Sequence, residues 1–378
     1  MTLEAMAPPS TKSQVLSSYD VADFPALNGL EEEWRFTPLK RLRELATATT
    51  ATGRPIGFEY ANLPSGVTAR QVGAAEVESV LLPFDRISAL AHGAAPDVTL
   101  IEVAADAVPD APALVRVVGQ GTDAPSYART SVRVGRFAKA TVVLEFVGSA
   151  TLADNVEVSV ADGAQLTLVT LANWADDAVQ AQHVRLRVGR DASVVHVQVA
   201  LGGDLVRQFT SVEYTGRGGQ AELYGLYFAD AGQHLEHRQL VDHSVPDCRS
   251  YVGYRGALQG DSAHAVWVGD VLIRAAATGT ETYEINRNLL LSDGARADSV
   301  PNLEIETGEV VSAGHASATG RFDDEQLFYL MARGITEAEA RKLVVRGFFA
   351  ELINKIPVPE LRERLGDVIE ARLAGAGS

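Results

Sequence analysis

Three histidines, His234, His237 and His243, lie close together in the sequence, and Asp242 stands beside the last of them. Imidazole nitrogens and carboxylate oxygens are ligands that divalent metals accept, so this segment is a candidate metal site. A spacing of three on a β-strand, however, places His234 and His237 on opposite faces. The alternative interpretation is that these histidines are half-exposed strand residues that pair across neighbouring strands.

Cys248 is the only cysteine of the chain. Its thiolate could ligate iron or act as a nucleophile, but a lone cysteine more often behaves as a small buried hydrophobic residue. An iron–sulfur cluster usually needs four protein ligands, mainly cysteines, so we do not expect the chain to carry such a cluster by itself. Without an intrachain disulfide, and with no secretory pattern in residues 1–12, the chain is expected to be cytoplasmic.

Pairs of acidic residues could serve an enzyme that cleaves sugars, because parallel β-helices often carry such enzymes. The pairs are Asp176 with Asp177, Glu304 with Glu306, and Asp323 with Asp324. Glycosidases need two carboxylates about 5–9 Å apart, a separation that the sequence does not show. Charge at a helix N-terminus explains Asp323 and Asp324 better. A carbohydrate-active β-helix enzyme therefore stays open as an alternative.

Nucleotide-binding and hydrolase motifs are absent from the chain. It has no GxxxxGKS or GxxxxGKT loop, no GxSxG elbow, no HExxH and no CxxC. We therefore expect no enzyme activity, and an ATPase would have to be another chain. The formal net charge of −16 over 378 residues opposes binding to nucleic acid or to an anionic membrane surface. No run approaches the roughly 20 apolar residues that cross a bilayer.

Alternation of apolar and other residues dominates the middle of the chain. Val142, Leu144 and Phe146 are one example of this pattern. Period-two alternation predicts strands with one buried face, and short segments such as 162–164, rich in Gly and Asp, predict tight turns. Turn signals recur about every 28 residues with a drifting period, which is near the coil length of a solenoid. A pair of sandwiches, a propeller or a barrel would also fit.

The two flanks carry helical patterns. In the N-terminal part, Thr37 and Pro38 predict a helix start with a hydroxyl cap, and Leu39, Leu42 and Leu45 follow at helical spacing. The C-terminal part predicts three helices, with Gly334 ending the first. Its capping-box pairs are Asp323 with Gln326, and Thr336 with Glu339.

One long segment resembles a known family. Residues 301–317 read PNLEIETGEVVSAGHAS, residues 320–330 read GRFDDEQLFYL and residues 332–335 read ARGI. This run closely resembles the end of the core of the SufB/SufD family of iron–sulfur cluster assembly proteins. NRNLLLS at 286–292, the segment 243–258 and EWRFT at 33–37 fit the same family. The SufD branch is the better match, because SufB proteins are longer and carry more cysteines.

The resemblance implies a mainly β fold and a scaffold role. The expected architecture is an N-terminal mixed or helical region (1–96), a right-handed β-helix core (97–322) and a C-terminal helical domain (323–378). The expected partners are a SufB-like chain, forming a heterodimer, and a SufC-like ABC-type ATPase; a homodimer is possible for the isolated chain. No tightly bound cofactor is expected, only a transient iron–sulfur cluster or iron at the interface with the SufB-like partner. A self-sufficient SufB-like scaffold is the remaining alternative.

The resemblance also makes His315 the principal candidate for cluster or metal assembly. Its neighbours Gly314, Ala316 and Ser317 are small and would leave the imidazole accessible. A neutral imidazole can ligate iron, and it can also hold a proton. Many SufD proteins have a cysteine two residues before this histidine, where this chain has Ala313. The SufB-like partner would therefore supply the thiolate and the carboxylate.

Two surfaces are expected to bind partners. Phe348, Phe349 and Leu352 are candidates for docking the ATPase, because a short helical tail cannot bury every apolar residue that it carries. Strands within roughly 260–320 are expected to pair with the SufB-like chain, since an edge with apolar segments such as 289–291 and 303–305 invites strand addition. The alternative is that these leucines fill the solenoid's own core.

Overall fold

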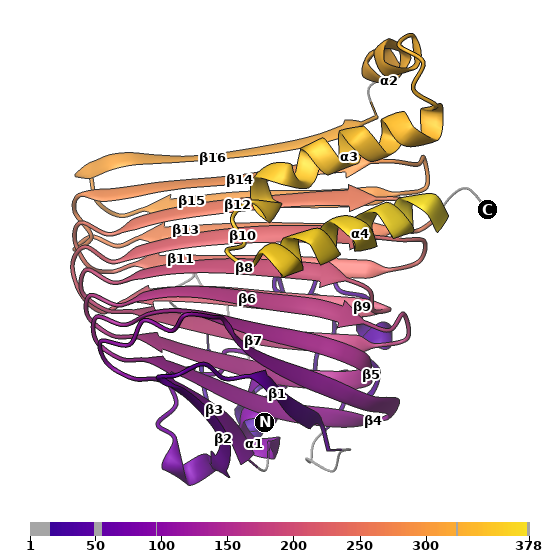
Figure 1. Ribbon diagram of the computed structural model, residues 1–378. Coiled ribbons are helices and arrows are strands. Elements are labelled where there is room, and N and C mark those ends of the chain that lie inside the picture. Colours follow the sequence, from indigo (N-terminus) through magenta and orange to yellow (C-terminus); the bar gives the residue numbers. More distant parts are fainter. Residues whose placement is uncertain (1–15, 49–54, 96, 323, 376–378) are drawn as a thin grey trace.

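The computed structural model describes residues 16–48, 55–95, 97–322 and 324–375. Its body is a parallel β-solenoid of about eight turns, with helices at either end of the chain (Figure 1), which confirms the predicted β-helix-like fold. The first strands are β1 (Gly57–Asn62), β2 (Val67–Gly73), β3 (Asp97–Val103), β4 (Ala113–Val134) and β5 (Lys139–Val160). The coils continue as β6 (Gln165–Trp174), β7 (Val179–Val188), β8 (Ser193–Leu201), β9 (Leu205–Tyr214), β10 (Gln220–Ala229), β11 (His234–His243), β12 (Arg249–Leu258), β13 (His264–Ile273), β14 (Thr280–Leu290), β15 (Arg296–Ile305) and β16 (Val310–Arg321).

The strands wind into two facing layers. In one layer β7, β9, β11, β13 and β15 pair in parallel, and in the other layer β6, β8, β10, β12, β14 and β16 do so. The long strand β5 joins them, because its first half pairs with β6 and its second half with β7. The strand order ends at β15 in one layer and at β16 in the other. These two strands are therefore the edges at the C-terminal end of the solenoid.

The coils lengthen along the chain, which explains the drifting period of the turn signals. Asp154 and Gln182 are register partners on successive coils and lie 28 residues apart. Near the C-terminal end, Ser250 and Thr282 are partners 32 residues apart. The strands keep about ten residues each, so the extra residues fall in the turns.

Large aromatic rings fill the inside of the later coils. Trp267, Tyr227 and Tyr254 are fully buried there. Gly225 and Gly256 make room for two of them, since a Cβ atom would stand 1.8 Å from Tyr254 at the first glycine and 1.8 Å from Tyr227 at the second. Each glycine thus allows a ring to lie directly against a strand backbone.

The N-terminal segment covers the outer face of the layer that contains β7 and β9. Its helical elements are the 3₁₀ helices η2 (Val21–Asp23), η3 (Leu39–Ala46) and η4 (Ala74–Glu76), and the α-helix α1 (Arg86–Ala94). Trp34, Leu42 and Leu45 are buried against Val179 and Leu205 of the strands. This part of the chain is therefore packed on the solenoid.

The prediction that the Thr37 hydroxyl caps a helix starting at Pro38 is wrong. No side chain caps η3, and Arg43 interrupts it with a φ of 56°. The Thr37 hydroxyl instead donates to the Glu236 carboxylate at 2.6 Å. A leucine every third residue matches the three residues per turn of a 3₁₀ helix rather than an α-helix.

The C-terminal helices α3 (Glu337–Ile353) and α4 (Pro359–Gly375) cover the outer face of the other layer, whereas α2 (Asp324–Met331) projects beyond β16 (Figure 1). Val345, Phe349 and Leu365 are buried against the strands. Arg255 of β12 donates to the Phe348 carbonyl oxygen at 2.6 Å, and Arg364 of α4 donates to the Glu145 carboxylate of β5 at 2.6 Å. These helices lie along the side of the solenoid, not over its end.

The C-terminal helix boundaries follow from capping chemistry. The Thr336 hydroxyl accepts from the Glu339 amide at 3.3 Å, which confirms Thr336 as an N-cap. Gly334 has a φ of 88° and donates to the Met331 carbonyl while Ile335 donates to Leu330, as in a Schellman motif. The other expected cap, Asp323, lies outside the described residues.

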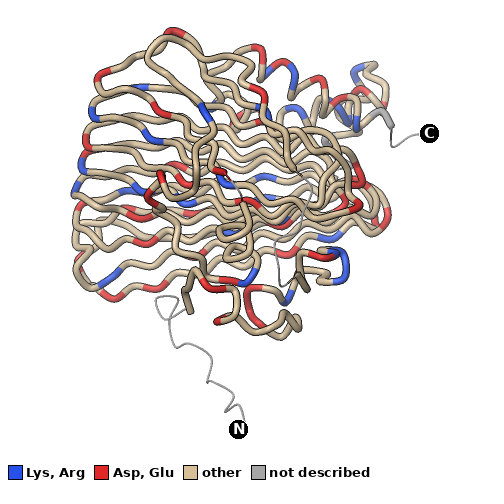
Figure 2. Tube along the Cα trace, turned by 90° about the horizontal axis from the view of Figure 1, so that it is seen from below, with Lys and Arg blue, Asp and Glu red and all other residues tan. Residues whose placement is uncertain are grey.

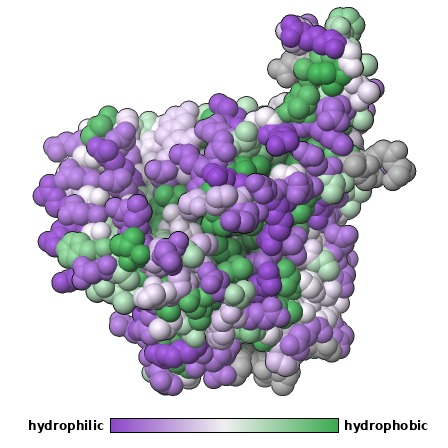
Figure 3. Space-filling model, viewed as in Figure 1, coloured by the Kyte–Doolittle hydropathy of each residue, from purple (hydrophilic) through white to green (hydrophobic). Residues whose placement is uncertain are grey.

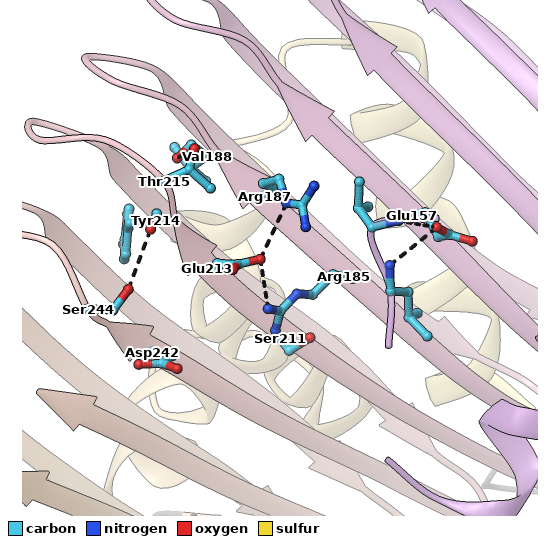
Figure 4. A network of polar contacts seen from close by, with 12 residues as sticks. Glu157, Arg185, Arg187, Val188, Ser211, Glu213, Tyr214, Thr215, Asp242 and Ser244 are labelled. Carbon is cyan, nitrogen blue, oxygen red and sulfur yellow. Dashed lines mark hydrogen bonds and ion pairs between the residues drawn. The ribbon is translucent and has the colours of Figure 1, made fainter. Parts of the chain in front are cut away.

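Ion pairs link side chains on successive coils along the outer side of the strands. The Glu213 carboxylate of β9 accepts from Arg185 at 2.8 Å and from Arg187 at 3.4 Å, both on β7 (Figure 4). On the same layer, the nearly unexposed Arg129 and Glu157 pair at 2.9 Å. Many of the charged residues lie at the turns between strands (Figure 2).

Candidate functional site

His315 lies in the middle of β16, the edge strand of its layer, and its side chain is 43% exposed. Its register partner on β14 is Glu284. The imidazole Nδ1 atom lies 3.8 Å from Oε1 of that carboxylate. The structure therefore places the principal candidate at the open end of the solenoid and brings it against a residue that the sequence analysis did not select.

Glu284 is an unusual residue to find inside the coil. Its side chain is 1% exposed, and both carboxylate oxygens are without a hydrogen-bond partner among the described residues. Burial, with a further contribution from the Asp270 carboxylate, raises the pKa of Glu284 to about 8, against a smaller opposing effect of the Asn302 backbone. The buried carboxyl therefore holds a proton at neutral pH unless a cation comes close.

A polar network continues from this pair along the inside of β14. Asn286 donates to the Tyr227 hydroxyl at 2.9 Å and accepts from Ser299 at 2.6 Å, and Asn288 donates to Asn286 at 2.7 Å. Tyr227 in turn donates to Asn288 at 2.5 Å. Because these amides satisfy one another, they fix β14 and hold the Glu284 backbone in place.

Sequence reasoning could have found Glu284. It has the same strand parity as Thr282, Asn286 and Asn288, which all point inward on β14. A polar residue at an inward position of an alternating strand is the signal. The sequence could not show which residue of the next coil faces it, because that depends on a register set across 31 residues.

The thiol candidates do not join this site. Ala313, at the position where the resemblance leads us to expect a cysteine, packs partly buried against the interior core. Cys248 is buried at a turn and its thiol donates to the Gly216 and Pro246 carbonyl oxygens, each at 3.5 Å. Burial raises the pKa of the Cys248 thiol, so the neutral form dominates at physiological pH.

His237 and His243 point into the solenoid. His237 stacks on Tyr227 with ring centroids 4.8 Å apart, and His243 stacks on Tyr214 at 4.9 Å. Burial lowers the pKa of both imidazoles to about 3, so both are neutral at pH 7. They act as aromatic core residues in this structure.

His234 lies on the outer side of the same strand, so His234 and His237 do occupy opposite faces. Its Nε2 atom lies 3.2 Å from the Glu236 carboxylate, and its Nδ1 atom lies 3.1 Å from Nδ1 of His264. His264 in turn contacts Asp298 at 2.7 Å. Within the part of the chain that is described, no group of three or more His, Cys, Asp or Glu side chains is arranged to hold a metal ion.

The three residues expected to dock an ATPase differ in accessibility. Phe349 and Leu352 are 0% and 3% exposed in the contact between α3 and the strands, and Phe348 is partly buried beside them. Among the described residues of this region, the exposed large apolar side chains are Phe328, Tyr329, Met331 and Leu343. Apolar surface is visible on the projecting α2 (Figure 3).

The leucines expected at the partner edge have internal contacts. Leu290 and Leu303 pack against the core inside the coils, whereas Leu289 and Leu291 pack against the cluster under the C-terminal helices. Ile305 at the end of β15 and Val311 on β16 remain 46% and 70% exposed.

No helix among the described residues is long and apolar enough to cross a membrane.

Comparisons with known proteins cover the segment that carries the resemblance. Residues 117–348 match the family model described as SUF system FeS cluster assembly, SufBD core domain. An iron–sulfur cluster assembly SufBD family protein of Mycobacterium tuberculosis is 53% identical over 370 residues, with 96% of this chain and 93% of that protein covered. One from Mycobacterium leprae is 50% identical over 370 residues, covering 96% and 94%.

A second SufBD family protein of Mycobacterium tuberculosis is 27% identical over 221 residues, which is 58% of this chain and 26% of that protein. The chain is thus similar to two different family members of one organism. The length of the family match and the identity to the first set of relatives decide the assignment: the chain belongs to the SufBD family of iron–sulfur cluster assembly proteins.

Proposed function

We propose that this chain is a SufD-type scaffold subunit, which builds iron–sulfur clusters in the cytoplasm together with a SufB-like partner and a SufC-like ATPase. The observation that carries the proposal is the position of His315. It is a half-exposed imidazole on an edge strand, where a second chain can reach it. Iron and the cluster are cargo, and His315 offers one nitrogen ligand from this side.

The partner surface is proposed to be the C-terminal end of the solenoid. β15 and β16 have neighbours on one side only, so their outer backbone groups can pair with strands of another chain. Ile305 and Val311 give this end exposed apolar side chains. The similarity to two family members of one organism, at 53% and 27% identity, supports a pair of different but related chains.

The ATPase is proposed to bind the projecting end of the C-terminal region. Phe328, Tyr329 and Met331 of α2 and Leu343 of α3 are all more than 40% exposed. Apolar side chains gathered on a helix are suited to contact with a partner protein. Phe349 and Leu352 would instead hold α3 on the strands, so that the docking helix has a fixed base.

The SufD assignment is favoured over a self-sufficient SufB-like scaffold by the thiol inventory. Cys248 is the one cysteine, it is buried, and its thiol faces backbone carbonyl groups. A sugar-cleaving enzyme has less support, because Asp176 and Asp177 lie exposed in the turn between β6 and β7. We therefore propose no second function.

Co-purification tests the proposal. The chain would carry an affinity tag and be co-expressed with a SufB-like and a SufC-like protein from the same genome. We expect all three to purify together, with iron and acid-labile sulfide in the complex after anaerobic isolation. A tagged chain that purifies alone, or a complex that acquires iron and sulfide equally well without it, would refute the scaffold role.

A further inference from the structure

We propose that Glu284 is a second ligand that this chain itself provides, so that a divalent metal ion, the iron of the cargo, is held between its carboxylate and the His315 imidazole. The inference rests on the proposed function and adds an oxygen ligand to it. Imidazole with carboxylate is a donor set that ferrous iron accepts.

The distance between the two groups suits one shared ion. Bonds of roughly 2.0–2.2 Å to nitrogen and oxygen leave two donor atoms of one ion about 3–4 Å apart. His315 Nδ1 and Glu284 Oε1 are 3.8 Å apart. The two residues are direct register partners on neighbouring strands, so the backbone fixes their separation. An ion could therefore bind without moving either strand.

The carboxylate lacks the partners that a structural role would give it. A buried polar group costs free energy unless it is hydrogen-bonded, and a buried charge costs more. Glu284 is 1% exposed, yet neither of its oxygens has a hydrogen-bond partner among the described residues. The side-chain amide of the nearby Asn302 donates to Asp270 at 2.8 Å. A cation between Glu284 and His315 would remove this deficit.

The structure also makes room for the carboxylate beside this position. At Gly269, on the facing layer, a Cβ atom would stand 2.4 Å from Glu284 Oε2. Only a residue without a side chain allows the carboxylate to occupy that space. An ion could reach Glu284 from solvent past His315, because the His315 side chain is 43% exposed. Water would complete the coordination shell in the isolated chain, and groups of the partner in the complex.

Metal titration of the purified, isolated chain tests the inference. Cobalt(II), an optical probe for iron(II), would be followed by absorption and by calorimetry for the wild type, Glu284→Gln and His315→Ala. Glu281→Gln is the matched control, because Glu281 lies on the same strand but is half-exposed on its outer side beside Arg249. Thermal melting would show that each variant is folded.

We expect one cobalt ion per wild-type chain, an affinity at least tenfold lower in Glu284→Gln and in His315→Ala, and no change in Glu281→Gln. The cobalt affinity of Glu284→Asp, which keeps the carboxylate on a shorter side chain, should lie between the affinities of the wild type and Glu284→Gln. An affinity for Glu284→Gln within twofold of the wild type, or no binding by the wild type, would overturn the inference. The proposed function would survive either result if the three proteins still purify together with iron and sulfide.

Discussion

The Thr37 hydroxyl donates a 2.6 Å hydrogen bond to the Glu236 carboxylate, although 199 residues separate the two in sequence. Glu236 is completely buried, and its carboxylate also forms ion pairs with Arg238 at 2.9 Å and with Arg207 at 3.3 Å. Arg207 lies over the Trp34 ring at 3.8 Å. The N-terminal segment is thus attached to the middle of the solenoid by a buried, charged network.

Loss of this contact should destabilise the protein. Thr37→Val keeps the volume but removes the donor, and a hydrogen bond to a charged group contributes about 1.5–3 kcal/mol. We expect the free energy of unfolding, measured with urea, to decrease by that amount. Thr68→Val, at an exposed position of β2, should change it by less than about 0.5 kcal/mol. Equal effects of the two substitutions would show that Thr37 does not anchor the segment.

Asp154 should give the stability of the protein a specific pH dependence. Burial raises the pKa of Asp154 from 3.8 to about 7, against hydrogen bonds from Gln182 and Gln180. Between these values the folded state holds a proton that the unfolded state has lost, so stability decreases as pH rises from about 4 to about 7. The unfolding free energy of the wild type, relative to that of Asp154→Asn, should therefore decrease by up to about 4 kcal/mol as pH rises across this window.

Denaturant unfolding at several pH values measures that difference. Asp177→Asn, which changes an exposed carboxylate in a turn, should not reproduce the slope. A difference that stays constant from pH 4 to pH 8 would mean that Asp154 does not titrate in this range.

Two phenylalanines of the C-terminal region should behave in opposite ways. Phe349 is fully buried, so Phe349→Ala should reduce the unfolding free energy by about 3–5 kcal/mol. Phe328 is 74% exposed on α2, so Phe328→Ala should leave stability within about 0.5 kcal/mol of the wild type and yet weaken ATPase binding. Affinity purification with the ATPase checks the second part, and undiminished binding by Phe328→Ala would place the docking surface elsewhere.

The edge strand β16 should be sensitive to added charge if it pairs with a second chain. Val311 is 70% exposed there, and Val311→Asp should weaken the complex with the SufB-like chain by at least tenfold. Val108→Asp is the matched control, because Val108 is 69% exposed but precedes β4 at the other end of the solenoid. Size-exclusion chromatography at several concentrations would measure both, and equal complex formation by the two variants would argue against pairing at this edge.

Much of the fold could be predicted because period-two alternation and short turns are local signals. Val142, Leu144 and Phe146 are all buried inside the coil, as their spacing indicates. The C-terminal capping at Thr336 and Gly334 could be predicted for the same reason. Thr37 shows the limit, since its hydroxyl bonds a residue 199 positions away rather than the backbone of its own helix.

The site could be predicted only in part. His315 stood out by its small neighbours and by a family signature, whereas its contact with Glu284 depends on the register between β14 and β16. Phe349 and Leu352 show the converse problem, because an apolar helix face has the same sequence pattern whether it binds a partner or the chain's own sheet. Only the packing of α3 on the strands separates these two possibilities.

His315→Ala tests the central claim most directly. Since the side chain is half-exposed and the Glu284 carboxyl group lies 3.8 Å away, beyond hydrogen-bond distance, its removal should leave the fold, the three-protein complex and the ATPase activity intact. The measurement is the activity of iron–sulfur enzymes in cells whose only copy of this chain carries the substitution. We predict that this activity falls at least tenfold while the complex still purifies; activity equal to that of the wild type would contradict the assignment of His315 as a ligand for the cluster.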